Sequence, residues 1–202
     1  MLAAGAGRRM GRPKALVTWN GEPLLAHVAR SLEAVREVET VCVVLGAAAA
    51  EIRATIPLPP HVRVAVNESW EYGGMLSSIL TGLRALEAEG AAAGGLLVWP
   101  VDHPAVRPST VAALVRASAS EWVDVAVPAY HGRRGHPVLF GPATYEALAS
   151  APPDEGARSI VRARAASRLE LPVDDPGVVT DLDWPADLEA LERRLAPLGD
   201  AG

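Results

Sequence analysis

The chain has 202 residues, of which 50% are hydrophobic and 21% charged, and its formal net charge at pH 7 is -5. This length and composition are typical of one globular domain with a sizeable core. The acidic balance argues against a nucleic-acid-binding domain, which is normally basic, and no apolar run approaches the roughly 18 to 20 residues that span a bilayer.

The first predicted element is a very short strand followed by a basic, glycine-rich loop. Residues 2–14 read LAAGAGRRMGRPK, in which Gly5, Gly7 and Gly11 allow backbone N–H groups to approach an anion. Lys14, the only lysine beside eighteen arginines, ends the segment. Because only two residues precede the loop, we expect either a truncated first strand or a natural chain that is a few residues longer, and we favour the longer chain. The loop predicts a polyphosphate site, with a solvated basic turn as the alternative.

Two common phosphate-binding patterns do not fit this loop. The Walker A pattern GxxxxGK[ST] cannot be aligned on it, and the dinucleotide fingerprint GxGxxG fails at Met10. Pro13 would also fall within the helix that the dinucleotide fingerprint requires.

Strand-like and helix-like segments then alternate along the chain. Near-continuous apolar runs are typical of parallel strands buried on both faces, and apolar residues at helical spacing predict the intervening helices. This alternation predicts a single three-layer α/β/α domain over residues 1–202, with a mostly parallel central sheet. The expected strands are 38–46, 62–67, 95–102, 123–130, 136–140 and 168–173. The expected helices are 24–35, 76–86, 142–149, 155–165 and 185–195.

Polar residues gather where the second of these strands leads into a helix. In NESWEYGGMLSSIL, Asn67 ends the strand, Gly74 precedes the helix, and Ser77 and Ser78 fall in its first turn. Exposed amides and hydroxyls at a helix N-terminus suit a base, a sugar or a phosphate. Ordinary helix capping is the alternative.

Two aspartates are candidate metal ligands. Asp102 ends the apolar strand LLVWPVD, and ligands of open α/β sheets bind at the carboxyl ends of strands. One or two carboxylates commonly hold a Mg²⁺ ion that bridges phosphates, although Asp102 could equally be a turn residue. Asp183, in DLDWPADL, could cap a helix or supply a second magnesium carboxylate.

The segment YHGRRGHPVLF, residues 130–140, places two arginines between glycines. It predicts a hairpin with an anion-binding or substrate-facing tip. His131 and His136 do not predict a metal site, because no third ligand has a recognisable spacing.

The order of these motifs resembles the MobA-like NTP transferase family, and within it the molybdenum-cofactor cytidylyltransferases. The family's LAAGxxxRMGxPK, N…W…GMxSS…G, DxP, GHPVLF, DxGAR and DxDxPxDL segments all have counterparts, and together they cover nearly the whole chain. Two positions depart from the family pattern: His103 stands where the family usually has glutamine, and Trp184 where it has threonine. These departures leave the acceptor substrate open. The counterparts are residues 2–14, 67–82, 102–104, 135–140, 154–158 and 181–188.

The resemblance implies a Rossmann-like nucleotidyltransferase fold of the nucleotide-diphospho-sugar transferase type. It implies a magnesium-dependent transfer of NMP from an NTP to a small phosphorylated acceptor, with release of pyrophosphate. Ala3 and Ala4 replace a Gly-Gly pair of guanylyltransferase relatives, which favours CTP, and molybdopterin is the favoured acceptor. The nucleotide-binding part would be about residues 1–105 and the acceptor-binding part about 106–195. A contact with a molybdoenzyme or its maturation factor is also implied.

Roles for individual residues follow from the resemblance. Such chemistry needs in-line positioning and cancellation of phosphoryl charge, and a compact ammonium can approach the α-phosphate as a point charge. The implied catalytic residues are Arg9, Lys14 and Asp102, and the implied Mg²⁺ ligands are Asp102 and Asp183. The implied acceptor-binding residues are Arg134, Gly135, His136 and Pro137. The implied nucleotide-binding residues are Leu2, Ala3, Ala4, Gly5, Gly7, Arg9, Gly11, Lys14, Asn67, Gly74, Ser77 and Ser78.

Two other classes of function stay open. An NAD(P)H-dependent oxidoreductase could use the glycine-rich loop, although no acidic residue roughly 20 positions on ends a strand to bind a ribose hydroxyl. A non-catalytic nucleotide-binding protein is the third class, and the joint presence of Arg9, Lys14 and Asp102 argues against it. With Cys42 as the single cysteine and no secretory signal, we expect a cytoplasmic protein without nucleic-acid or membrane partners.

Overall fold

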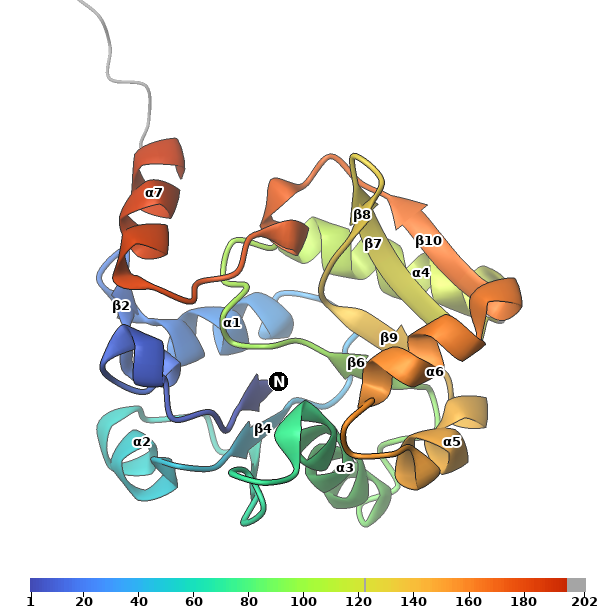
Figure 1. Cartoon of the computed structure of the whole chain (residues 1–202), viewed down its shortest axis with the longest axis horizontal. Helices are drawn as coiled ribbons and strands as arrows, with labels where there is room; N and C mark the ends of the chain where they lie inside the picture. Colours follow the sequence, from blue (N-terminus) through green and yellow to red (C-terminus); the bar gives the residue numbers. More distant parts are fainter. Residues whose placement is uncertain (122, 196–202) are drawn as a thin grey trace, which may run out of the picture.

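The structure, a computed structural model, describes residues 1–121 and 123–195. Its centre is a mostly parallel β-sheet (Figure 1). In the strand order given at the end of this paragraph, β9 is the strand that runs antiparallel to its neighbours. A short strand, β8 (Arg133–Arg134), forms a hairpin with β7, and β2 (Thr18–Trp19) pairs with β3 (Glu22–Pro23) apart from the main sheet. The row runs β5 (Arg63–Val66), β4 (Cys42–Leu45), β1 (Leu2–Ala3), β6 (Leu96–Val98), β9 (Val138–Phe140), β7 (Val125–Tyr130) and β10 (Arg168–Pro172).

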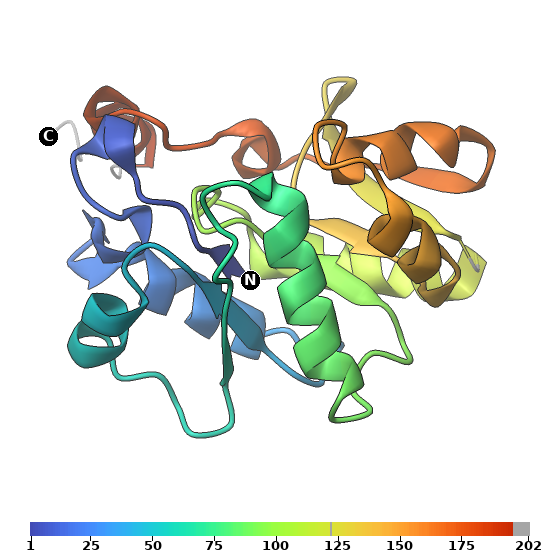
Figure 2. The same ribbon diagram turned by 60° about the horizontal axis from the view of Figure 1, so that its bottom comes forward.

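Helices cover both faces of the sheet (Figure 2). Successive residues of a strand point to opposite faces of the sheet, so one strand contributes side chains to the cores on both faces. In β7, Val125 and Val127 pack into one core, whereas Ala126 packs into another. The first face carries α3 (Gly74–Glu87), α5 (Tyr145–Ser150) and α6 (Ala157–Ala163). The opposite face carries α1 (Leu24–Glu33), α2 (Ala49–Thr55) and α4 (Pro108–Glu121), and α7 (Pro185–Leu195) packs against the same core.

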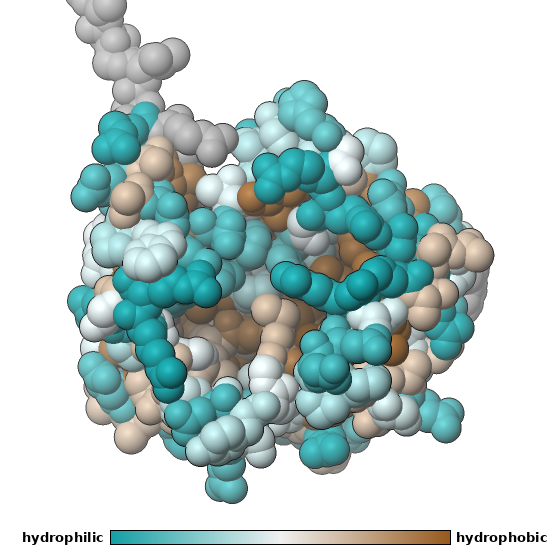
Figure 3. All heavy atoms as spheres, in the orientation of Figure 1, coloured by the Kyte–Doolittle hydropathy of each residue, from teal (hydrophilic) through white to brown (hydrophobic). Residues whose placement is uncertain are grey.

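The face drawn in Figure 1 is hollowed near its centre. The space-filling view in Figure 3 shows apolar residues inside this hollow and mostly hydrophilic residues around it. Within the described part of the chain, no helix is both long enough and apolar enough to cross a membrane.

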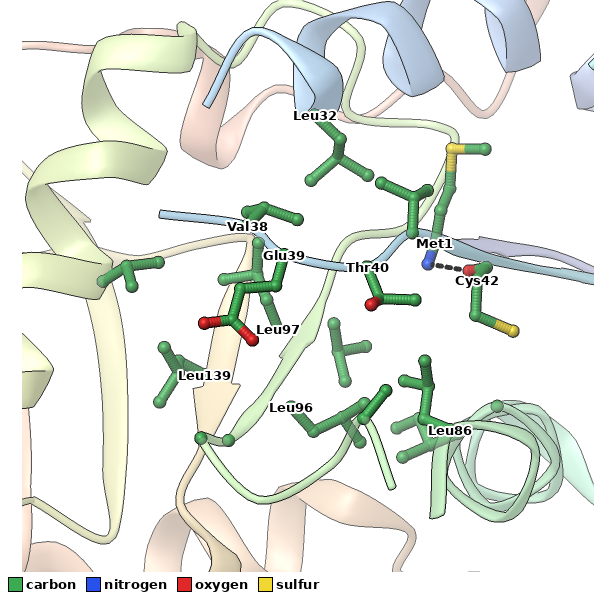
Figure 4. Close-up of a pocket in the computed structure, with 18 of the residues that line it drawn as sticks. Met1, Leu32, Val38, Glu39, Thr40, Cys42, Leu86, Leu96, Leu97 and Leu139 are labelled. Carbon is green, nitrogen blue, oxygen red and sulfur yellow. Dashed lines mark hydrogen bonds between the residues drawn. The ribbon is translucent and has the colours of Figure 1, made fainter. Parts of the chain in front are cut away.

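The two-residue strand β1 joins the halves of the sheet. The backbone N–H of Leu2 donates to the carbonyl of Trp99 at 2.9 Å, and the N–H of Val101 donates back to the carbonyl of Leu2 at 2.9 Å. Before β1, the α-ammonium of Met1 is buried and donates to the carbonyl of Cys42 at 2.7 Å (Figure 4), and burial lowers its pKa to about 6. A cavity of about 170 Å³ lies beside Met1, between β4 and β6.

The structure confirms the predicted α/β fold with its mostly parallel sheet and short first strand, and it narrows the bounds of most elements. The expected strand 136–140 begins only at Val138, and the expected strand 38–46 begins only at Cys42. Helix α4 was not predicted, because two of its four buried residues, Thr110 and Ser118, are polar and break the apolar stripe. Helix α2 was missed because it is short and buries only Ile52. Residues 122 and 196–202 of the expected domain lie outside the described residues.

Candidate active site

The loop after β1 is bent back on itself before it reaches Lys14. Gly7 and Gly11 both adopt positive φ, at 63° and 71°. A Cβ atom at Gly7 would lie 2.0 Å from the carbonyl oxygen of Arg12, so a side chain there would prevent the bend. A 3₁₀ turn over Lys14–Leu16 follows, and its Ala15 is buried. The turn therefore anchors the backbone of Lys14, while its side chain reaches the carboxylates of Asp102 and Asp183.

A chain of charged side chains lies where this loop meets the segment after β6. Lys14 Nζ donates to Asp102 Oδ2 at 2.8 Å and to Asp183 Oδ1 at 2.7 Å. Arg9 Nη1 donates to the other oxygen of Asp183, and Asp102 Oδ1 lies 2.9 Å from Nδ1 of His103. The ammonium of Lys14 is thus held between two carboxylates that come from distant parts of the chain.

The pKa values of this cluster follow from its pairing. Burial alone would raise the pKa of Asp102, but the hydrogen bonds from His103 and Lys14 and the charge of Lys14 hold that pKa well below its usual range. The hydrogen bond from Lys14 lowers the pKa of Asp183. Burial alone would lower the pKa of Lys14, but the two carboxylates outweigh it and raise that pKa. Both carboxylates and the ammonium are therefore charged at neutral pH.

The start of α7 positions Asp183. Asp187 Oδ2, in the first turn, accepts hydrogen bonds from the backbone N–H of Asp183 at 2.9 Å and of Trp184 at 2.7 Å. Trp184 is 54% exposed, and the guanidinium carbon of Arg9 lies 5.9 Å from the centroid of its ring. Sequence reasoning left open that Asp183 caps this helix, but Asp187 is the aspartate that accepts from the N–H groups at its start.

A pocket of about 250 Å³ opens beside the charged cluster, between the glycine-rich loop and the start of α3. Lys14 and Asp102 lie on its wall, together with Gly74 and Ser78 from α3. The pocket therefore joins three of the segments that sequence reasoning singled out. Its lining is Leu2, Ala3, Ala4, Gly5, Gly7, Lys14, Ala15, Trp70, Gly74, Met75, Ser78, Pro100, Val101 and Asp102.

Asn67 lies behind this pocket instead of on its wall. It is 3% exposed, and its Nδ2 donates to Ser77 Oγ at 2.8 Å and Ser78 Oγ at 3.0 Å. Its Oδ1 accepts from the backbone N–H of Ser69 at 2.9 Å. Asn67 thus holds the N-terminus of α3 against the end of β5. Arg9, Gly11 and Ser77 of the expected nucleotide-binding set also lie outside the pocket lining.

Part of the expected acceptor-binding segment reaches the cluster through a pair of histidines. The backbone N–H of His136 donates to the carbonyl of Val178 at 2.8 Å. The centroid of the His136 ring lies 4.7 Å from the centroid of the His103 ring. Burial lowers the pKa of His136 to about 4, and its buried Nδ1 has no hydrogen-bond partner among the described residues. Arg134, also of the expected acceptor-binding segment, has its Nη1 3.8 Å from Oε1 of Glu170 in β10.

Several residues of the site were not assigned by sequence reasoning. Pro100 and Val101 line the pocket, and their position directly before Asp102 was the available signal. Trp70 and Met75 also line it, although they were noted only as matches to a family pattern. The contact between His103 and His136 had no sequence signal, because it depends on two loops meeting in space.

The cluster could supply two carboxylate ligands to a magnesium ion, but not a complete set of protein ligands. Among the described residues, no group of three or more His, Cys, Asp or Glu side chains is placed to hold a metal. However, Asp102 and Asp183 already converge on one cation, the ammonium of Lys14. Mg²⁺ in phosphate sites is commonly bound by one or two carboxylates, with water and substrate phosphates as its other ligands, so these two carboxylates fit.

Comparison with known proteins assigns the chain to a family. A family model for the MobA-like NTP transferase domain matches residues 1–169. A nicotine blue oxidoreductase of Paenarthrobacter nicotinovorans is 36% identical over 170 residues, which cover 80% of this chain and 79% of that protein. A probable molybdenum cofactor guanylyltransferase of Bacillus cereus (strain G9842) is 28% identical over 138 residues, which cover 66% of this chain and 62% of that protein.

Solved structures agree with this assignment. The crystal structure of Rv0371c from Mycobacterium tuberculosis H37Rv matches with a TM-score of 0.79 at 26% identity and covers 95% of each chain. A second structure of that protein is a complex with manganese, with a TM-score of 0.71, and 94% of each chain is covered. The chain belongs to the MobA-like NTP transferase family.

Proposed function

We propose that this protein transfers CMP from CTP to a small phosphomonoester acceptor and releases pyrophosphate. The observation that carries the proposal is the contact of Lys14 with both Asp102 and Asp183 beside the pocket of the glycine-rich loop. This arrangement supports the proposal, because a side chain that suits phosphate and two carboxylates that suit a divalent metal lie together beside one pocket.

In this reaction, an oxygen of the acceptor's phosphate forms a bond to the α-phosphorus while the bond to the departing pyrophosphate breaks. The loop amides from Gly5 to Gly11 hold the β- and γ-phosphates, and Lys14 and Arg9 offset the charge on the phosphoryl oxygens. Asp102 and Asp183 would hold the divalent ion, which when bound neutralises the triphosphate and the leaving pyrophosphate. The manganese complex of Rv0371c supports a divalent metal in this family.

The choice of CTP rests on the family resemblance. Ala3 and Ala4, which line the pocket, stand where guanylyltransferase relatives have a Gly-Gly pair. The relatives named as molybdenum cofactor guanylyltransferases support molybdopterin as the acceptor, and His136, next to His103, is where the acceptor would meet the site.

Pyrophosphate release tests this proposal directly. The protein is incubated with each of the four NTPs, with Mg²⁺ or Mn²⁺, and with molybdopterin or sugar phosphates as acceptors. We expect pyrophosphate with CTP and molybdopterin. If GTP is preferred, the base assignment is wrong. If nucleotide binds but no NTP releases pyrophosphate, the protein is a non-catalytic nucleotide-binding protein.

A second candidate function is a reduction by NAD(P)H, which is favoured by the 36% identity to a nicotine blue oxidoreductase. The same loop amides could bind the diphosphate of a dinucleotide. Oxidation of NADPH with nicotine blue, in EDTA and undiminished in Asp102→Asn, would support this function over nucleotidyl transfer.

A further inference from the structure

The cations and anions of the site pair with one another. Lys14, which we assign to phosphate, pairs with both carboxylates that we assign to metal, Asp102 and Asp183. Arg9 pairs with the second oxygen of Asp183. The side chains of Lys14, Asp102 and Asp183 are only 18%, 24% and 33% exposed, so solvent and salt screen these pairs less than exposed pairs.

We propose that Lys14 occupies the cation position between Asp102 and Asp183 until a metal–nucleotide complex binds, so that metal and triphosphate are taken up together. The inference rests on the proposed function. A metal ion alone must displace the ammonium and leave it without a counter-ion. A triphosphate alone must take the cations and leave two unpaired carboxylates beside its own negative charge. The metal–nucleotide complex gives every group a new partner: its metal pairs with the two carboxylates, and its triphosphate pairs with the cations.

The structure holds the carboxylates in place more firmly than the cations. Asp102 accepts a hydrogen bond from His103, and Asp187 binds the backbone N–H of Asp183. By contrast, Lys14 carries its charge on a flexible four-carbon stem, and the Arg9 side chain is 58% exposed. The exchange therefore needs the movement of two flexible side chains, while the metal position between the carboxylates stays preformed.

Removal of Lys14 tests whether its ammonium competes with the metal. Binding of Mn²⁺ alone is measured by electron paramagnetic resonance on the wild type, Lys14→Met and Arg8→Met. Arg8 is the matched control, because it lies in the same loop but pairs with Glu71 and its side chain is 77% exposed. We expect Lys14→Met to tighten Mn²⁺ binding about tenfold or more and Arg8→Met to change it less than about threefold. Unchanged or weaker Mn²⁺ binding in Lys14→Met would overturn the inference.

Removal of a carboxylate should affect nucleotide binding with opposite signs. Asp183→Asn should bind CTP more tightly in EDTA, because Lys14 and Arg9 lose a competing partner, and should bind the Mn²⁺–CTP complex more weakly. Glu71→Gln is the control, because it removes the same charge from the partner of Arg8. Changes of the same sign in both conditions would contradict the exchange.

The wild type provides a test that does not depend on whether any variant folds. Calorimetry compares CTP in EDTA, Mn²⁺ alone and the Mn²⁺–CTP complex. We expect the complex to bind at least about tenfold more tightly than either component. If metal and nucleotide bind independently, this inference is wrong while the proposed function stands. If neither binds in any combination, both are wrong.

Discussion

The ammonium of Lys14 lies 2.8 Å from the carboxylate of Asp102, although 88 positions separate the two residues in the chain. They meet because β1 and the segment after β6 are neighbours in the sheet, joined by the bridge between Leu2 and Pro100. The loop after β1 and the aspartate after β6 therefore leave the sheet at the same edge. This is the edge at which open α/β sheets bind their ligands.

Loss of either partner should affect turnover more than folding. We predict that Lys14→Ala and Asp102→Asn each lower kcat by about 10² or more, or about 3 kcal/mol of transition-state stabilisation. Pyrophosphate release under saturating CTP and Mg²⁺ measures the effect, with circular dichroism to show that each variant is folded. Arg8→Met is the matched charge control. Normal turnover by either variant would rule out the proposed mechanism.

Two glycines of the loop should respond differently to alanine. At Gly7, a Cβ would collide with the carbonyl of Arg12 and φ is positive, so we expect Gly7→Ala to cost about 1–3 kcal/mol of stability. At Gly5, no atom lies within 4 Å of the added Cβ, so Gly5→Ala should keep the wild-type Tm. It should still weaken CTP binding, because Gly5 lines the pocket. Thermal unfolding and calorimetry measure the two effects, and equal Tm shifts would contradict this account of the bend.

Asn67 should matter for stability more than its polar character suggests. We predict that Asn67→Ala lowers the free energy of unfolding by about 1–3 kcal/mol, because it leaves the buried Ser78 hydroxyl and the Ser69 N–H without a partner. Urea denaturation measures the change. Glu68→Ala, at the exposed neighbouring position, should change it by less than about 0.5 kcal/mol. A stable Asn67→Ala variant that binds CTP poorly would instead make Asn67 a direct ligand of the nucleotide.

In a chain that begins at Met1, stability should depend on pH through the α-amine of that residue. Its pKa falls from 8.0 to about 6 on folding because the amine is buried. Between pH 6 and pH 8 the unfolded chain therefore binds more protons than the folded chain, so the free energy of unfolding rises with pH. A pKa difference of about two units corresponds to about 2–3 kcal/mol in the free energy of unfolding.

The contribution of this amine is isolated by comparing the free chain with an Nα-acetylated chain in urea at pH 6 and pH 8. The cavity beside Met1, about 170 Å³ in volume, offers room for the acetyl group. The acetylated chain should lack the amine's share of the pH dependence, while the histidines contribute equally to both chains. An identical pH dependence in the two chains would show that the amine does not titrate in this way.

Much of the fold could be predicted because strand burial is visible in the local sequence. The runs around Cys42–Leu45 and Val125–Tyr130 are apolar on both faces, as a strand between two helical layers must be. Helix α4 escaped prediction because Thr110 and Ser118 are buried on its packed side. A polar residue in a packed helix face can be explained only once its neighbours are known. Asp175 supplies part of the explanation, since its Oδ2 accepts from Thr110 Oγ1 at 2.7 Å.

The sequence by itself determined the alternation of strands and helices, the glycine-rich loop and the family resemblance, because each depends on residues close together in the chain. Only the tertiary structure decided that Asp183 of its acidic segment contacts Lys14, 169 positions away, while Asp187 holds the backbone beside it. It also decided that Asn67 faces the inside of the protein and that His136 meets His103. The physical reason is that side chains pair across loops brought together at one edge of the sheet, and no local pattern records which loops those are.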